Sequence, residues 1–170
     1  IMSTKYEKLN YKIINIPKIT RGQVETVLAC KRFINNVRSL AIYNIDTNFK
    51  SSRLKSRLLT MKNQKIDGLL GAYYSTDPKF SFIKLDSNGF VKQTKEKKVI
   101  SNLASTGLYV FTSGSDFTKA AEKMIKQNIR TKNEFFVSEL YNILIQEKRK
   151  FIVDISEEFI PLGTPEEVNS

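Results

Sequence analysis

The prediction of the fold starts from residues 39–48, which read SLAIYNIDTN. The first five residues form a compact apolar run that suits a buried strand, and the strand passes directly into a polar loop containing Asp46. Open α/β sheets form their ligand crevice at the carboxyl ends of the strands. A carboxylate there suits Mg²⁺, which takes oxygen ligands from one or two carboxylates plus substrate phosphates. The alternative is an aspartate that caps a turn.

Strands and helices alternate on both sides of this run. An antiparallel hairpin interrupts the alternation, because Asp86-Ser87-Asn88-Gly89 is a turn sequence between two β-prone segments. The pattern predicts an α/β domain with a mostly parallel mixed sheet, flanked by helices and carrying one hairpin excursion. Besides 39–43 and the hairpin, we expect strands at 11–16, 67–74, 105–112 and 151–155, and helices at 22–36, 51–61, 115–128 and 137–147.

The composition excludes several chemistries. The 170 residues contain no His and one Cys, so the chain has no Ser-His-Asp or Cys-His relay, no His-bearing zinc site and no internal disulfide. Cys30 falls in a predicted amphipathic helix and is interpreted as a packed side chain. The longest apolar run, 69–74, is too short to span a membrane. We expect a cytoplasmic protein without a membrane span.

The net charge of +11 raises the question of an anionic partner. A basic stretch without acids lies between Asp46 and Asp67, and it could attract nucleic acid or an anionic surface. The remaining Lys and Arg are scattered along the chain, and the sequence carries no recognised nucleic-acid motif. We therefore expect no nucleic-acid partner and keep a basic binding module as an alternative. The basic residues of the stretch are Lys50, Arg53, Lys55, Arg57, Lys62 and Lys65.

Four further residues are candidates for binding chemistry. Glu96 could accept hydrogen bonds from hydroxyls while Lys97 holds a phosphate, or both could belong to an exposed charged strand end. Gly107 lies inside a predicted strand, where it marks either a close ligand or a bulge. Glu134 precedes a predicted helix and could reach a hydroxyl or favour the positive helix end.

In this order, six segments resemble the sugar-phosphate nucleotidyltransferase family, whose fold resembles that of the nucleotide-sugar glycosyltransferases (GT-A-like). The segment at 162–167, LGTPEE, together with Phe80-Ser81-Phe82, is most similar to the branch found in bacterial capsule and surface-polysaccharide clusters. A nucleotide-sugar glycosyltransferase remains the alternative enzyme class. The six segments are 20–27, 43–46, 78–97, 104–109, 133–135 and 162–167.

The resemblance implies transfer of a nucleoside monophosphate from a nucleoside triphosphate, with a pyrimidine base favoured, to a sugar 1-phosphate or a similar phosphorylated small molecule. Pyrophosphate would be released. The implied roles are Asp46 as Mg²⁺ ligand and catalytic residue, Lys97 as catalytic and phosphate-binding residue, Gly22, Gln23 and Asn44 as nucleotide-binding residues, and Glu96, Gly107 and Glu134 as substrate-binding residues.

Two departures from the family pattern shape the remaining expectations. The Gly-rich triphosphate loop that opens the family signature is absent. Thr164-Pro165-Glu166-Glu167 is a typical helix start, and three residues follow it in the sequence. We therefore expect one nucleotidyltransferase domain over 1–170 that lacks its N-terminal nucleotide-binding segment and its final helix. Pro161 stands where many relatives have a second metal-binding Asp, so either Glu166 or Glu167 substitutes for it or the metal is bound differently. The oligomeric state is not predicted.

Overall fold

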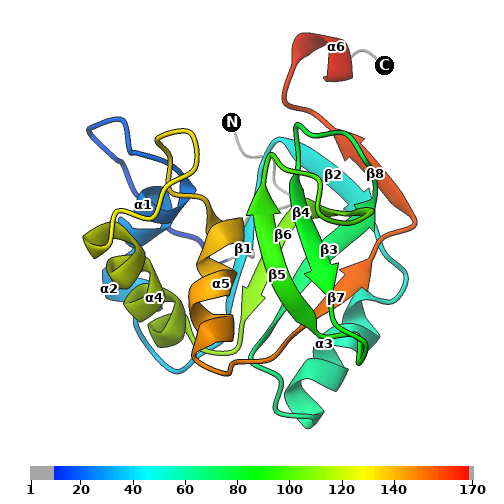
Figure 1. Ribbon diagram of the computed structural model, residues 1–170. Helices are drawn as coiled ribbons and strands as arrows, with labels where there is room; N and C mark the ends of the chain where they lie inside the picture. The colour runs from blue at the N-terminus through cyan, green and yellow to red at the C-terminus, as the bar shows by residue number, and fades with distance from the viewer. Residues whose placement is uncertain (1–9, 169–170) are drawn as a thin grey trace.

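The computed structural model describes residues 10–168. They form a six-stranded sheet between two layers of helices, together with a separate two-stranded ribbon (Figure 1). The sheet has the order β5-β4-β6-β3-β7, with β1 paired to β6. Its strands are β1 (Leu40–Tyr43), β3 (Gly68–Tyr74), β4 (Ser81–Leu85), β5 (Val91–Glu96), β6 (Leu103–Phe111) and β7 (Phe151–Ile155). The ribbon pairs β2 (Thr47–Lys50) with β8 (Glu158–Pro161).

The helices lie on both faces of the sheet. They are α1 (Gln23–Leu28), α2 (Lys31–Ile34), α3 (Leu54–Asn63), α4 (Gly114–Lys126), α5 (Val137–Gln146) and α6 (Pro165–Val168). The pleat of β3 sends Leu69 and Leu70 to opposite faces, so each face has its own core. Leu70 packs with Phe117 of α4 and Leu140 of α5, and Leu69 lies in the smaller core that includes Met61 of α3. The α/β class with helices on both faces is confirmed.

The prediction of a mostly parallel sheet is wrong, because β3 and β7 form the one parallel ladder in the described sheet. The connection through α3 does bring β1 and β3 into the same direction, as expected for a helical crossover. However, β6 lies between them and runs antiparallel to both. Their shared direction therefore produces no parallel ladder.

Strand β6 organises the sheet because two strands share one of its edges. Residues 108–111 of β6 pair with β1, and Ala104 pairs with Phe82 of β4. The other edge pairs with β3 along most of its length, with a register shift between Leu70 and Ala72. The shared edge changes partner around Gly107.

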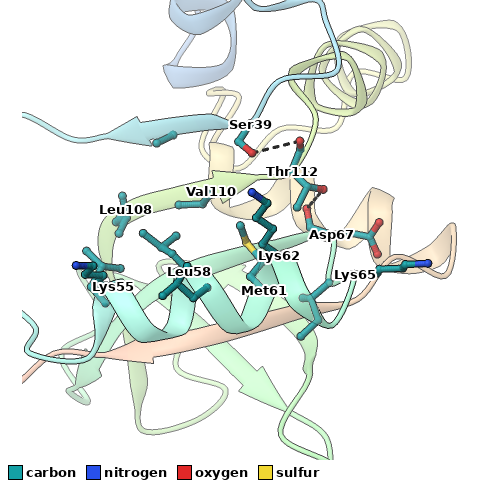
Figure 2. Close-up of a pocket in the computed structure, with 14 residues that line it drawn as sticks. Ser39, Lys55, Leu58, Met61, Lys62, Lys65, Asp67, Leu108, Val110 and Thr112 are labelled. Carbon is teal, nitrogen blue, oxygen red and sulfur yellow. Dashed lines mark hydrogen bonds between the residues drawn. The ribbon is translucent and has the colours of Figure 1, made fainter.

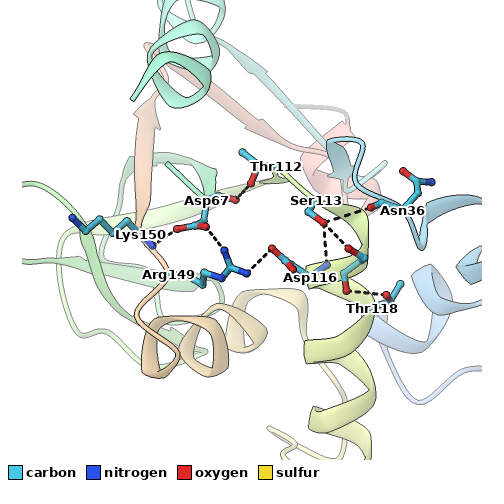
Figure 3. A network of polar contacts seen from close by, with 9 residues as sticks. Asn36, Asp67, Thr112, Ser113, Asp116, Thr118, Arg149 and Lys150 are labelled. Atoms are coloured by element: carbon cyan, nitrogen blue, oxygen red, sulfur yellow. Dashed lines mark hydrogen bonds and ion pairs between the residues drawn. The ribbon is translucent and has the colours of Figure 1, made fainter. Parts of the chain in front are cut away.

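A polar network fastens the end of the sheet where β3 begins and β6 ends (Figure 3). The Arg149 guanidinium lies 2.8 Å from Asp67 and 3.1 Å from Asp116, and the Lys150 N–H donates to Asp67 at 2.8 Å. The backbone carbonyl of Asp67 also accepts from the hydroxyl and the N–H of Thr112. Ser113 caps α4 by accepting from the Asp116 N–H. The network joins β3, β6, α4 and the α5–β7 turn.

Several local predictions need correction. Residues 11–16 form no strand, and the predicted helix over 22–36 is divided into α1 and α2. Strand β1 is half exposed, since alternate residues face outward. The ribbon strands β2 and β8 were not predicted, because each has four residues and offers too short a periodic pattern. The helix start at Thr164 is confirmed, with the Thr164 hydroxyl accepting from the Glu167 N–H at 3.3 Å.

Candidate active site

A cleft of about 300 Å³ opens where the shared edge of β6 changes partner. Its walls come from the β1–β2 turn, the open end of the β4–β5 hairpin, the residues before α5 and the β8–α6 connection. Six of the nine residues that the sequence assigned to binding or catalysis line it, although they span most of the chain. They are Gln23, Asn44, Asp46, Glu96, Gly107 and Glu167.

Gly107 forms the floor of the cleft. Its φ of +83° lies in the left-handed region that favours glycine, at the irregularity where β6 changes partner. A Cβ at this position would lie 2.8 Å from the Cβ of Asn44, whose N–H donates to the Gly107 carbonyl at 3.0 Å. The bulge interpretation of Gly107 is therefore confirmed. Its contact with a substrate stays a prediction.

Gln23 connects two walls of the cleft through its side-chain amide. Its Nε2 donates to Oδ1 of Asn44 at 3.2 Å, and its Oε1 accepts from the Val137 N–H at 3.3 Å. Gly22, just before it, has φ of +121°, and a Cβ there would lie 2.7 Å from the backbone nitrogen of Phe135. Gly22 therefore lets α1 lie against the segment before α5 and does not itself line the cleft.

Asp46 is held by its backbone, with its carboxylate exposed. The Asp46 carbonyl accepts from the Leu162 N–H at 2.8 Å, and the neighbouring Thr47 hydroxyl donates to the Thr106 carbonyl at 2.9 Å. Within residues 10–168, the Asp46 carboxylate has no hydrogen-bond or ion-pair partner. The loop is thus fixed while its acidic group stays available.

The carboxylates of Asp46 and Glu167 approach the same space beside Gly163. A Cβ built on Gly163 would lie 3.4 Å from Oε2 of Glu167 and 3.7 Å from Oδ2 of Asp46. Glu167 also accepts from the Gly163 N–H at 3.0 Å and pairs with the Lys79 ammonium at 2.8 Å, which lowers the pKa of its carboxyl group. Pro161 lines the cleft and has no donor or carboxylate to offer.

This donor set fits Mg²⁺. Two carboxylates suffice for an ion that takes its other ligands from water and substrate phosphates. In the part of the chain that the structure describes, no group of three or more His, Cys, Asp or Glu side chains could hold a metal. Asp46 and Glu167 as the residues that would hold the ion stay a prediction.

Glu96 is buried, with 7% of its surface exposed, so the interpretation as an exposed strand end does not apply to it. Its Oε2 accepts from the hydroxyls of Ser81 and Ser138, the latter at 3.0 Å. Burial raises the pKa of the Glu96 carboxyl, and the two hydrogen bonds partly oppose this rise.

Lys97 follows at the end of β5 and is exposed. Its φ of +52° is uncommon for a residue other than glycine. The backbone turns there because the Lys97 N–H donates to the Phe80 carbonyl at 3.0 Å. The ammonium lies 5.4 Å from the centre of the Phe136 ring, and Phe136 lines the cleft. Lys97 thus stands at the margin of the cleft.

Glu134 lies away from the cleft lining. It is exposed and its backbone forms a bridge with Thr131, so its predicted contact with a hydroxyl remains untested. Sequence reasoning did not assign individual roles to several residues that line the cleft. Lys79, Phe80 and Ser81 lie in the hairpin segment that the family resemblance covered, whereas Phe159 comes from the unpredicted strand β8.

A larger groove of about 1000 Å³ lies between α3 and the β1–β6 part of the sheet (Figure 2). Its lining is mainly aliphatic, with Leu58, Leu108 and Val110 among the side chains. Asp67 is the one acid that lines it, and its carboxylate is already bound to Arg149 and the Lys150 N–H. The groove contains none of the predicted site residues.

The structure assigns local partners to part of the basic stretch. Arg57 donates to the Val153 carbonyl at 2.7 and 3.0 Å, and Arg53 donates to the Ile155 carbonyl at 3.4 Å. Both guanidinium groups therefore cover carbonyls of β7, and Lys50 pairs with Glu158 at 3.1 Å. Over residues 10–168, no helix is both long and apolar enough to cross a bilayer.

Comparison with solved structures identifies the fold. The chain is similar to a nucleoside-diphosphate-sugar pyrophosphorylase from Vibrio cholerae RC9, with 30% sequence identity and a TM-score of 0.72 over 91% of this chain and 66% of that chain. The chain has a nucleotide-sugar pyrophosphorylase fold.

Two further structures share the pyrophosphorylase fold at lower identity. One is a UDP-glucose pyrophosphorylase complexed with UDP-glucose (18% identity, TM-score 0.71, 88% of this chain and 60% of that chain). The other is a candidate glucose-1-phosphate thymidylyltransferase from Bacillus anthracis in complex with a sucrose (16% identity, TM-score 0.68, 89% and 60%). The chain thus spans less than two thirds of the length of these proteins. No family model and no curated protein matches the sequence.

Proposed function

We propose that this chain belongs to a sugar-phosphate nucleotidyltransferase, which transfers a nucleoside monophosphate from a nucleoside triphosphate to a sugar 1-phosphate or a similar phosphorylated small molecule. Pyrophosphate is the second product. The observation that carries the proposal is the convergence of Asp46, Glu96 and Gly107 in one cleft, on a fold shared with pyrophosphorylases. The acids and the backbone floor come from three separate segments.

The chemistry requires few protein groups. A phosphate oxygen of the acceptor attacks the α-phosphorus of the triphosphate in line, the bond to the β-phosphate breaks, and pyrophosphate leaves with that electron pair. The acceptor oxygen is already anionic, so the step needs no general base, in keeping with a chain that has no His. Mg²⁺, when bound, would neutralise phosphate charge. Asp46 and Glu167 would hold the ion, and Lys97 would attract the acceptor phosphate.

The other cleft residues would orient the two substrates. Glu96 would accept a hydrogen bond from an acceptor hydroxyl, and Gly107 would allow the acceptor to approach the backbone of β6. Gln23 and Asn44 already bind each other, so together they would form one polar wall beside the nucleotide. Gly22 would act indirectly, by seating α1 against the segment before α5.

The proposal extends to the cellular setting. A pyrimidine triphosphate is the favoured donor, and capsule or surface-polysaccharide synthesis in the cytoplasm is the favoured role. The polysaccharide role follows from the resemblance of residues 80–82 and 162–167 to the capsule branch, and the pyrimidine preference follows from the habit of the resembled family as a whole. Residues 1–170 would form one nucleotidyltransferase domain.

Pyrophosphate release tests the function. The full-length protein is mixed with Mg²⁺, each of the five common nucleoside triphosphates and a panel of sugar 1-phosphates. We expect release that requires both substrates, with the highest turnover for CTP, UTP or dTTP. Release of a nucleoside diphosphate from a nucleotide-sugar, without pyrophosphate formation, would instead identify a glycosyltransferase. Tight RNA or DNA binding with a steep salt dependence would favour the basic binding module.

A further inference from the structure

Strand β5 is an edge strand of the sheet, and α5 lies beside its outer edge (Figure 1). Alternate residues of an edge strand leave their N–H and C=O groups without a neighbouring strand. At Thr94 both groups have the same partner: the N–H donates to Oδ1 of Asn142 at 2.9 Å, and the C=O accepts from Nδ2 of Asn142 at 3.0 Å. One side-chain amide thus replaces the peptide group of a missing strand.

Two residues along the same edge, a second side chain binds the backbone N–H but not the C=O. The Glu96 N–H donates to Oε1 of Glu139 at 2.9 Å. Glu139 and Asn142 lie three residues apart and therefore share one face of α5. Three helical residues rise about 4.5 Å and two strand residues about 6.7 Å, and the longer glutamate side chain bridges the difference. The helix and the strand edge therefore match at two consecutive outward positions.

The matched edge ends at the acid in the cleft. Ser138, also in the first turn of α5, donates to Oε2 of Glu96 at 3.0 Å, and the Thr94 hydroxyl donates to the Ser138 carbonyl at 2.6 Å. The Ser81 hydroxyl binds the same oxygen of Glu96 from β4. In the described structure, the other oxygen of Glu96, Oε1, has no hydrogen-bond partner, and Glu96 lines the cleft.

Burying the Glu139 carboxylate costs free energy that merely covering the edge of β5 would not require. Glu139 is 7% exposed, and burying a carboxylate is unfavourable unless it is paired and hydrogen-bonded. Its charge is met by the Glu96 N–H, by Nδ2 of Asn142 at 3.1 Å and by the Lys95 ammonium at 3.5 Å. An apolar side chain would exclude water from this edge without that cost, but it would leave the Glu96 N–H unbound.

We propose that Glu139 and Asn142 are positioning residues for acceptor binding, which hold the end of β5 so that Glu96 presents Oε1 to a hydroxyl of the acceptor. This proposal rests on the proposed function of the cleft. It adds to that function the two α5 residues that hold Glu96 in place. The charged groups near Glu96 are Lys97, which follows it, and Glu139 itself.

The test compares side chains of matched size on one helix. Asn142→Leu and Glu139→Leu remove the edge hydrogen bonds, whereas Glu139→Gln keeps an oxygen that can accept from the Glu96 N–H. Gln146→Leu is the control, because Gln146 is an exposed amide one turn beyond Asn142 without a hydrogen-bond partner in the described structure. The full-length enzyme is assayed with the sugar phosphate that gives the highest turnover in the pyrophosphate screen, and melting temperatures are measured alongside.

We expect both leucine variants at positions 139 and 142 to raise the acceptor KM about 5- to 10-fold while the nucleotide KM changes less than about 2-fold. Glu139→Gln should restore most of the acceptor affinity, and Gln146→Leu should leave both KM values unchanged. A purely structural role would lower the melting temperature with no separation of the two KM values, and that result would overturn the proposal. If a leucine variant does not fold, Glu139→Gln and Asn142→Asp are compared instead. The criterion is again whether the acceptor KM changes more than the nucleotide KM.

Different results would refute the proposed function and the positioning role of Glu139 and Asn142. A wild-type enzyme that releases pyrophosphate but whose variants leave the acceptor KM unchanged would refute the positioning role alone. A wild-type enzyme with no triphosphate-dependent turnover would refute the proposed function and the positioning role with it.

Discussion

The two ends of the sheet contain aspartates that are used in opposite ways. At the end where β3 begins, Asp67 is bound by Arg149 and by the Lys150 N–H, and Arg149 also binds Asp116. At the cleft end, Asp46 has a fixed backbone and a carboxylate without a partner in the described residues. A carboxylate with its partners in place stabilises the fold, whereas one left available can bind an ion or a substrate. The difference separates structural acids from candidate catalytic ones.

The largest effect is expected from a substitution at the cleft end of the sheet. Asp46→Asn in the full-length protein removes a charge from the proposed Mg²⁺ site, so we expect turnover to fall by about 100-fold or more, because charge neutralisation supplies several kcal/mol of the catalysis. The melting temperature should remain nearly unchanged, since the carboxylate has no partner to lose. Pyrophosphate release and calorimetry measure the two quantities. Turnover close to that of the wild type would remove Asp46 from the metal site.

The matched change at the network end should have the opposite effect. Asp67→Asn weakens the contacts with Arg149 and the Lys150 N–H. We expect the free energy of unfolding to fall by about 1–2 kcal/mol, a value kept small because solvent screens the partly exposed Arg149. Turnover per folded molecule should be retained. Denaturant titration with parallel assays checks this. A large loss of turnover with unchanged stability would contradict the division between the two ends.

A smaller effect should separate the two residues at the end of β5. Lys97→Ala removes an exposed ammonium at the margin of the cleft, and we expect the KM for the phosphorylated acceptor to rise about 5-fold, with little change in stability. Substrate titration at saturating triphosphate measures it. An unchanged KM would indicate that Lys97 belongs to the solvated, charged surface and does not bind the acceptor.

The smallest expected effect is a pH dependence that comes from Glu96. Its carboxyl pKa lies above the ordinary value of 4.5 because the group is buried, so the acceptor kcat/KM should fall as the pH is lowered through that raised pKa. The contribution of Glu96 to stability has the opposite sign. The folded state binds this proton more tightly than the unfolded state, so stability from this group increases as the pH falls.

The control for the pH dependence is Glu96→Gln, which cannot titrate. Its acceptor kcat/KM should be lower than that of the wild type at neutral pH and should lose the acid limb of the profile. An acid limb of the same position and depth in the variant would assign the titration to another group.

The sequence predicted the long elements well and the strand order poorly. Residues 67–74 and 105–112 are apolar enough to be recognised as central strands, and both are buried in the structure. Strand direction within a ladder depends on which strand lies between two others, and no local pattern contains that information. The insertion of β6 between β1 and β3 therefore overturned the expected parallel sheet.

The candidate site was predicted through its charged and glycine positions. Asp46 and Glu96 were identified as acids near strand ends and Gly107 as a glycine inside a strand, and all three line the cleft. The sequence could not choose between Glu166 and Glu167, whereas the cap at Thr164 directs Glu167 toward Gly163. Glu139 and Asn142 were read only as positions in an amphipathic helix, because their partners are backbone groups of a distant strand.

The change of partner along β6 has a consequence for how acceptor preference can diverge. At Gly107 the lining of the cleft is main chain, and a Cβ there would lie 2.8 Å from the Cβ of Asn44, so this position cannot be adjusted by ordinary side-chain replacement. The side walls come from the hairpin at Ser81 and the ribbon at Phe159, and the Phe159 ring packs edge-on against Phe80 of the hairpin segment, with the ring centres 5.7 Å apart. Under the proposed function, relatives with this frame can therefore acquire new acceptors by exchanging residues on the side walls while Gly107 stays constant.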